Sequence, residues 1–174
     1  PQGAERRDQM GRLLSAHRGI QVGETQYPGA IAIIPLHDDP DRVRTMEAAL
    51  FSIRNQIYQH PIRVAVGVNS QDPNLNQQVQ HMAETIGITA DIINAQAHSA
   101  DEQSAAFARN RILQELAERA KEDPNFRAGY FFLVDSDTVA SPHSLEFLIQ
   151  TIRGTEAAAV TSTSVPIDYL DKQT

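Results

Sequence analysis

The chain has 174 residues, of which 41% are hydrophobic and 21% are charged, as in an ordinary globular protein with one domain. Its formal net charge of −7 argues against a protein that coats nucleic acid, because that task needs a basic surface. The apolar runs are far shorter than the roughly 20 residues that cross a bilayer, and the absence of cysteine excludes disulfides and thiolate chemistry.

Residues 1–29 are predicted to form a helix and a connector that precede the main domain. Three apolar side chains lie at helical spacing among charged residues of segment 4–17: Met10, Leu13 and Leu14. This segment has no continuous hydrophobic stretch, so we expect no signal peptide, and together with the lack of cysteine it predicts a cytoplasmic protein. Pro1 is not a residue with which translation starts, so we expect a piece of a longer protein.

From residue 30 onward, segments of strand and helix character alternate. We predict strands over residues 30–36, 62–68, 88–95 and 130–134, helices over 41–59, 74–86, 102–121 and 143–153, and a candidate fifth strand over 157–161. Such an order builds right-handed βαβ units. The predicted fold class is therefore α/β, with a Rossmann-like open, mainly parallel sheet and helices on both of its faces.

The most informative stretch is the strand at residues 130–134 and the two carboxylates that follow it. The strand is aromatic and branched, as expected of a strand buried on both faces, and it leads into Asp135 and Asp137. Parallel strands carry their C-terminal residues to the edge where ligands bind. The two aspartates should repel each other unless a cation or a shared proton is present, which predicts a hard divalent metal that holds a phosphate. The competing interpretation is a pair of loop aspartates that cap the next helix.

A second polar group opens the predicted helix at residues 102–121. Small residues there allow close helix packing, while Arg109 offers a planar fork of donors that suits phosphate. Asn110 can bind a base or a sugar hydroxyl. The alternative is a solvated arginine on an amphipathic helix.

The ends of the first two strands carry further polar residues that should face the same edge as Asp135. His37 and Asp38 leave the first strand behind Pro35, and Asn69, Ser70, Gln71 and Asp72 leave the second. Asn69 or Asp72 could bind the edge of a nucleobase. Turn chemistry favours the same residue types for local reasons, so both interpretations stay open.

The order of these parts resembles the nucleotide-binding half of family 2-type glycosyltransferases with the GT-A fold, over residues 30–161. The resemblance rests on a strand ending in Ile-Ile-Pro, the helix segment LFSIRNQIY, an Ala-Arg-Asn helix and a strand ending in Val-Asp-Ser-Asp. It implies a metal-dependent enzyme that moves a sugar from a nucleoside diphosphate sugar to an acceptor hydroxyl of unknown identity. Residues 30–174 would then form the donor-binding part of a larger catalytic domain, an incomplete GT-A fold.

The resemblance also implies roles for single residues. Asp137 would be the main ligand of Mn²⁺ or Mg²⁺ on the donor diphosphate, and Asp135 would contact the sugar or ribose and lie next to the metal as a second ligand. Arg109 and Asn110 would lie near the diphosphate and the sugar. The remaining substrate-binding residues would line the nucleoside pocket: Pro35, His37, Asp38, Asn69 and Asp72.

The sequence departs from this family at two places. Family members carry an acidic Asp-Asp-Gly-Ser turn after the second strand, where this chain has Gly67, Val68, Asn69 and Ser70. The catalytic base and the acceptor site of the family lie beyond the aspartates, so no catalytic residue is assigned here.

Two other functions remain open. Haloacid dehalogenase-like phosphatases also place a nucleophilic aspartate after a hydrophobic strand, which would be Asp135, but they need a downstream lysine, and here only Lys172 follows. A non-catalytic module that binds a nucleotide or a carbohydrate is the alternative from a different class. A dehydrogenase is not indicated, because no Gly-x-Gly-x-x-Gly follows the first strand.

Overall fold

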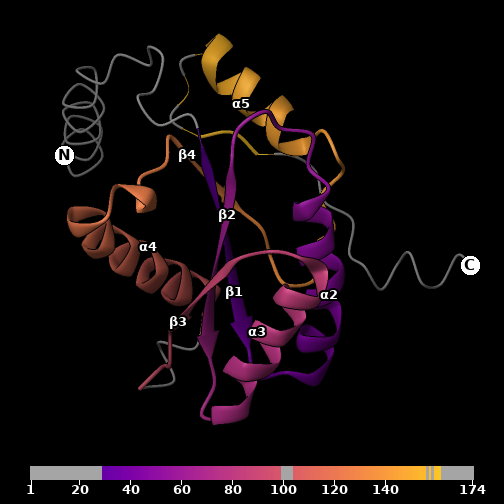
Figure 1. Cartoon of the computed structure of the whole chain (residues 1–174), viewed down its shortest axis with the longest axis vertical. Helices are drawn as coiled ribbons and strands as arrows, with labels where there is room; N and C mark the ends of the chain where they lie inside the picture. The colour runs from indigo at the N-terminus through magenta and orange to yellow at the C-terminus, as the bar shows by residue number, and fades with distance from the viewer. Residues whose placement is uncertain (1–28, 99–103, 156, 158, 162–174) are drawn as a thin grey trace, which may run out of the picture.

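Strands and helices alternate along the chain in the computed structural model, which describes residues 29–98, 104–155, 157 and 159–161. The elements in order are β1 (Ala30–His37), α2 (Pro40–Arg54), β2 (Ile62–Asn69), α3 (Pro73–Ile86), β3 (Ala90–Asn94), α4 (Ala105–Glu122), the 3-10 helix η3 (Pro124–Phe126), β4 (Tyr130–Leu133) and α5 (Ser144–Thr155) (Figure 1). The predicted alternation is thereby confirmed. The predicted helix over residues 4–17 lies outside the described residues.

The four strands form one all-parallel sheet in the order β3-β2-β1-β4. The chain runs outward from β1 through β2 to β3 and then returns to the other side of β1 for β4. The strand order therefore reverses between β1 and β4. Ligands of open α/β sheets bind beyond the carboxyl ends of the strands at such a point.

Helices cover both faces of this sheet, as predicted. Alternate residues of β1 point to opposite sides, with Ile31 and Ile33 packed with Ile112 of α4, and Ile34 packed with Leu50 of α2. Figure 1 shows α2 and α3 on one side of the strands and α4 on the other. The predicted Rossmann-like α/β architecture is confirmed.

Local chemistry fixes where the helices near the carboxyl edge begin. The carboxylates of Asp39 and Asp72 accept hydrogen bonds from backbone amides in the first turns of α2 and α3, at 2.9 and 2.8 Å, and each of these helices starts with proline. The hydroxyl of Ser104 caps α4 by accepting a bond of 3.1 Å from the amide of Phe107. The first turns of all three helices are therefore held in defined positions beyond the strand ends.

The strand that precedes the aspartates is not buried on both faces, and that prediction is wrong. Phe131 and Leu133 are 52% and 54% exposed, whereas Tyr130 and Phe132 are buried. The helix α4 packs on β1, β2 and β3, and β4 lies beyond β1 at the end of the strand order that the structure describes. The α4 side of β4 is consequently left open among the described residues.

Most predicted bounds lie within three residues of the observed ones, and two predictions differ by more. The helix predicted over residues 41–59 ends at Arg54, where the side-chain amide of Gln56 donates to the carbonyl of Ser52 at 3.0 Å and to the carbonyl of Ser141, before α5, at 2.7 Å. In the predicted fifth strand, the described residues 157 and 159–161 belong to no strand.

Gly67 in β2 allows α4 to lie close to the sheet. A Cβ atom added at this position would lie 2.7 Å from two side-chain carbons of Ile112 and 3.4 Å from the carbonyl oxygen of Ala108. Ile112 is fully buried and has little room to move. The approach of α4 at Gly67 therefore sets the position of the helix turn that carries Arg109.

We predict that Gly67→Ala lowers the free energy of unfolding by about 1 to 3 kcal/mol, because the methyl group overpacks the contact with Ile112. Urea unfolding followed by circular dichroism measures the change. Gly154→Ala in α5 is the matched control: nothing lies within 4 Å of its added Cβ, and stability should stay equal or rise by up to about 1 kcal/mol. Equal stability of the two variants would contradict the close approach.

Candidate functional site

Asp135 and Asp137 lie just beyond β4, and each forms an ion pair with an arginine. Arg109 of α4 donates to Asp135, and Arg42 of α2 donates to Asp137. Because α2 and α4 cover opposite faces of the sheet, the two arginines approach the aspartates from opposite sides. The repulsion expected between the carboxylates is thus reduced by two guanidinium groups of the chain itself.

Both ion pairs remain open to solvent. The side chains of Arg42 and Asp137 are 45% and 35% exposed, and those of Arg109 and Asp135 are 28% and 48% exposed. Exposed pairs of this kind contribute at most about 1 kcal/mol to stability. A ligand can therefore reach these carboxylates and exchange with their partners at small cost.

Arg109 has donor capacity that Asp135 does not use. Its Nε atom is buried and has no hydrogen-bond partner among the described residues, and a guanidinium offers five N–H donors in a planar fork. The predicted place of Arg109 at the edge near the aspartates agrees with the structure. Asn110, the next residue of α4, is exposed.

Arg42 was not predicted as a site residue from the sequence, although its position along the chain indicates that it lies at this edge. It is the third residue of α2, the helix that follows β1, and β1 pairs directly with β4. A first-turn residue of that helix must lie at the carboxyl edge of the sheet, near the residues that follow β4. The basic residues just after the first strand could therefore have been counted as site candidates.

Side-chain contacts join the ends of β1 and β2. The amide nitrogen of Asn69 lies 3.4 Å from Nδ1 of His37, and the hydroxyl of Ser70 donates to the carboxylate of Asp38 at 2.6 Å. The amide oxygen of Asn69 accepts a bond of 2.9 Å from the backbone of Ala97. The structure thus brings together the strand-end residues that the sequence predicted to share one edge.

Two predicted site residues have clear structural tasks at this edge. Asp72 caps α3 through the amide of Asn74. Pro35 is buried within β1, where it is paired with Gly67 of β2. One carboxylate oxygen of Asp72 is therefore used as a helix cap, as the turn-chemistry interpretation expects.

An open pocket of about 250 Å³ lies beyond β2 and β3, at the start of α3. Its polar lining comes from Ser70, Gln71, Asp72, Asn76, Asn94 and Gln96. Its lining contains no lysine or arginine among the residues that the structure describes. Side-chain amides that both donate and accept suit a neutral polar group, such as a base or a sugar, better than a phosphate. Ser70 links this pocket to Asp38 and so to the end of β1.

Asp135 and Asp137 are the residues of this edge that could hold a metal, provided that other ligands complete its coordination. Within the described part of the chain, no group of three or more histidine, aspartate or glutamate side chains gathers as a complete metal centre. Mg²⁺ is commonly held by one or two carboxylates, with phosphate oxygens and water as its other ligands. Asp135 and Asp137 would supply one or two hard oxygen donors of this kind to Mg²⁺ or Mn²⁺.

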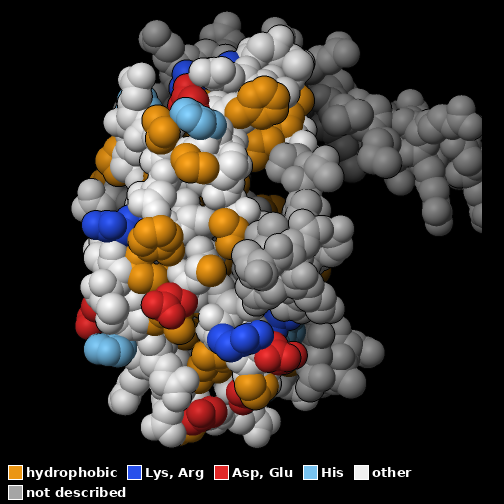
Figure 2. Space-filling model, turned by 90° about the vertical axis from the view of Figure 1, so that its right-hand side faces the viewer, with side chains coloured by type: hydrophobic (Ala, Val, Ile, Leu, Met, Phe, Trp, Pro, Cys, Tyr) orange, Lys and Arg blue, Asp and Glu red, His pale blue; other side chains and the backbone are white. Residues whose placement is uncertain are grey.

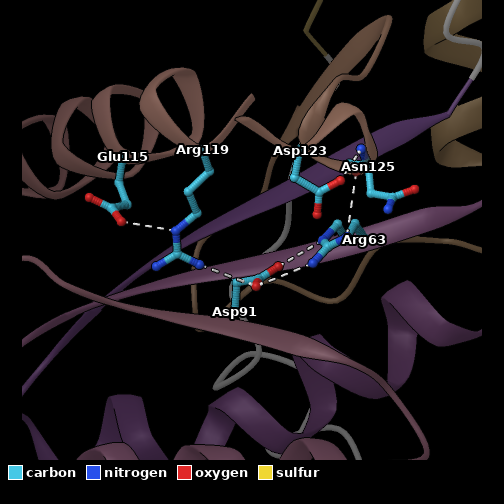
Figure 3. A network of polar contacts seen from close by, with 6 residues as sticks. All are labelled: Arg63, Asp91, Glu115, Arg119, Asp123 and Asn125. Carbon is cyan, nitrogen blue, oxygen red and sulfur yellow. Dashed lines mark hydrogen bonds and ion pairs between the residues drawn. The ribbon is translucent and has the colours of Figure 1, made fainter. Parts of the chain in front are cut away.

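A second cluster of charges lies toward the amino-terminal ends of the strands (Figure 3). Asp91 of β3 accepts from Nε of Arg63 at 2.8 Å and from Arg119 of α4 at 3.4 Å, and Arg119 also binds Glu115 at 2.9 Å. The guanidinium of Arg63 lies 4.0 Å from the ring centre of Phe126. This cluster fastens the C-terminal half of α4 to the sheet, away from the edge where the aspartates lie.

The hydrogen bond to Asp91 raises the pKa of Arg63 above its ordinary value, although burial acts in the opposite direction. The side chain of Asp91 is 14% exposed, far less than that of Asp135. Asp91 therefore has the contacts of an acid that stabilises the fold. Asp135 has those of an acid that a ligand can reach.

Figure 2 shows the side of the molecule on which α2 lies; most acidic side chains of this face lie in its lower half, toward the end where the strands of Figure 1 finish, whereas basic side chains lie at both ends. No helix among the described residues is long and apolar enough to cross a membrane.

No protein-family model and no curated protein was found to match this chain. The function is therefore argued from the chain's own residues.

We predict that Asp91→Asn lowers the free energy of unfolding by about 1 to 3 kcal/mol, because two guanidinium groups lose a half-buried charged partner. Asp135→Asn should change it by less than about 1 kcal/mol, because the carboxylate of Asp135 is 48% exposed. Urea denaturation of both variants makes the comparison. A loss at Asp135 as large as the loss at Asp91 would mark Asp135 as a structural residue.

Proposed function

We propose that this chain is the donor-binding part of a metal-dependent glycosyltransferase that uses a nucleoside diphosphate sugar. The observation that carries the proposal is the pair of solvent-accessible carboxylates, Asp135 and Asp137, at the reversal of strand order between β1 and β4. Two accessible acids flanked by two arginines at this edge suit a ligand that combines a divalent cation with phosphate.

Different residues of the site would bind the metal and the phosphates of such a donor. Asp137 and Asp135 would hold Mn²⁺ or Mg²⁺. When bound, the metal neutralises charge on the diphosphate as the bond to the sugar breaks. Arg109 would bind a phosphate oxygen through the part of its fork that Asp135 leaves free.

The pocket beyond β2 and β3 is the proposed place of the nucleoside. It lies on the same edge of the sheet as the aspartates, and the side-chain amides, the Ser70 hydroxyl and the Asp72 carboxylate of its lining offer donors and acceptors to a base or a ribose. The His37–Asn69 and Asp38–Ser70 contacts lie between this pocket and β4 in the strand order. A nucleoside diphosphate sugar would thus lie across the tips of β2 and β1 toward β4.

A second candidate function is nucleotide or carbohydrate binding without transfer. Five of the six aspartates that the structure describes along this edge have a close partner: Asp38 has Ser70, Asp39 and Asp72 cap helices, and Asp135 and Asp137 pair with arginines. The sixth, Asp41, pairs only loosely with Arg44 and is exposed on the surface of α2, so none of these described residues stands out as a base held beside an acceptor hydroxyl. This observation supports binding more strongly than it supports catalysis.

We expect isothermal titration of the chain with UDP, GDP and ADP to detect binding of at least one of them in the presence of Mn²⁺ and weaker binding with EDTA. Asp137→Asn should lower the affinity measured with Mn²⁺ by at least about tenfold, a change of about 1.4 kcal/mol. The physical reason is the loss of an anionic oxygen ligand of the metal.

Glu118→Gln is the matched control for this experiment. It also removes one negative charge, from an exposed side chain of α4 that pairs with Lys121, and it should leave nucleotide affinity unchanged. Equal affinities of the Asp137→Asn variant and the parent chain would remove the basis of the proposal. Release of phosphate from p-nitrophenyl phosphate, lost in Asp135→Asn, would replace it with the phosphatase function.

A further inference from the structure

Arg42 is the charged residue of the site that the resemblance to glycosyltransferases leaves without a role. It donates to Asp137, the acid proposed above as the main metal ligand. Its place in the first turn of α2 is fixed by the Asp39 cap and by Pro40 at the start of the helix. Arg42 is therefore held at the carboxyl edge by the same local structure that ends β1.

The pairing of Arg42 with Asp137 cannot persist unchanged once a divalent cation is bound. The cation and the guanidinium would compete for the same carboxylate oxygens and would repel each other at that distance. The exposure of both side chains makes the pair weak and exchangeable. A guanidinium released beside a metal-bound diphosphate has planar donors that fit phosphate oxygens in a bidentate manner.

We propose that Arg42 exchanges partners at this site: it neutralises Asp137 before the ligand binds and donates to the diphosphate when Asp137 takes up the metal. The inference rests on the proposed function, because it assigns Arg42 to the same site. It makes Arg42 a second donor-binding arginine, which reaches the ligand from the face of the sheet opposite to Arg109. Metal and diphosphate then bind in a mutually dependent way.

The exchange predicts that removal of Arg42 changes two affinities in opposite directions. Before the nucleotide binds, Arg42 opposes the metal, so its removal should strengthen the binding of Mn²⁺ alone. With the nucleotide present, Arg42 favours the complex, so its removal should weaken the binding of the Mn²⁺ nucleotide. A residue that only supports the fold would not change these two affinities in opposite directions.

The test compares Arg42→Gln with Arg44→Gln. Both substitutions remove one positive charge from an exposed arginine of α2, and Arg44 pairs only loosely with Asp41, at 3.9 Å. Mn²⁺ binding to the protein alone is measured by electron paramagnetic resonance, and binding of the nucleoside diphosphate that the parent chain prefers is measured by calorimetry with saturating Mn²⁺.

For Arg42→Gln we expect roughly two- to fivefold tighter binding of Mn²⁺ alone and on the order of tenfold weaker binding of the Mn²⁺ nucleotide. Arg42→Lys keeps the charge but loses the fork, so its nucleotide affinity should lie between those of the parent and Arg42→Gln. Arg44→Gln should match the parent in both measurements.

Several results would overturn the inference. The first is a nucleotide affinity of Arg42→Gln equal to that of Arg44→Gln, whether or not Mn²⁺ alone binds measurably. The second is weaker binding of Mn²⁺ alone to Arg42→Gln than to the parent chain. The outcome for Asp137→Asn separates this inference from the proposed function. If Asp137→Asn loses nucleotide binding while Arg42→Gln behaves like Arg44→Gln, only the role of Arg42 fails.

Discussion

The site depends on one topological constraint, the return of the chain to the far side of β1 for β4. This return places Asp135 and Asp137 beside the end of β1, between the first turn of α2 on one face and the N-terminal part of α4 on the other. An arginine from each helix can then reach one aspartate, Arg42 from α2 and Arg109 from α4. With β4 elsewhere in the sheet, neither of these two ion pairs could form.

The two ends of α4 have different tasks. At the amino ends of the strands, Asp91 accepts from two arginines and is mostly shielded from water, which fixes the helix on the sheet. Near the carboxyl ends, the contact of Ile112 with Gly67 sets how closely the helix approaches. The N-terminal part of α4 then presents Arg109 to an exposed acid. A rigid helix with a weakly paired residue near one end suits ligand exchange without loss of the fold.

The sequence was enough to predict the α/β class, the order of the elements and the edge at which the polar residues meet, because hydrophobic periodicity and strand ends are local properties. It was not enough to predict how the charges pair. The partner of Asp137 lies 95 residues away in α2, and only the order of the strands brings them together. The exposure of Phe131 and Leu133 was missed for the same reason, since it depends on which strands α4 covers.

The proposed function requires the carboxylates after β4 to bind a metal together with a nucleoside diphosphate. A crystal structure of the chain with Mn²⁺ and its preferred nucleoside diphosphate tests this requirement, because an anomalous difference map locates the manganese. We expect a manganese peak in direct contact with an oxygen of Asp137 and with the diphosphate, and Arg42 turned from Asp137 to a phosphate. A nucleotide bound elsewhere, with both aspartates still paired to their arginines, would contradict it.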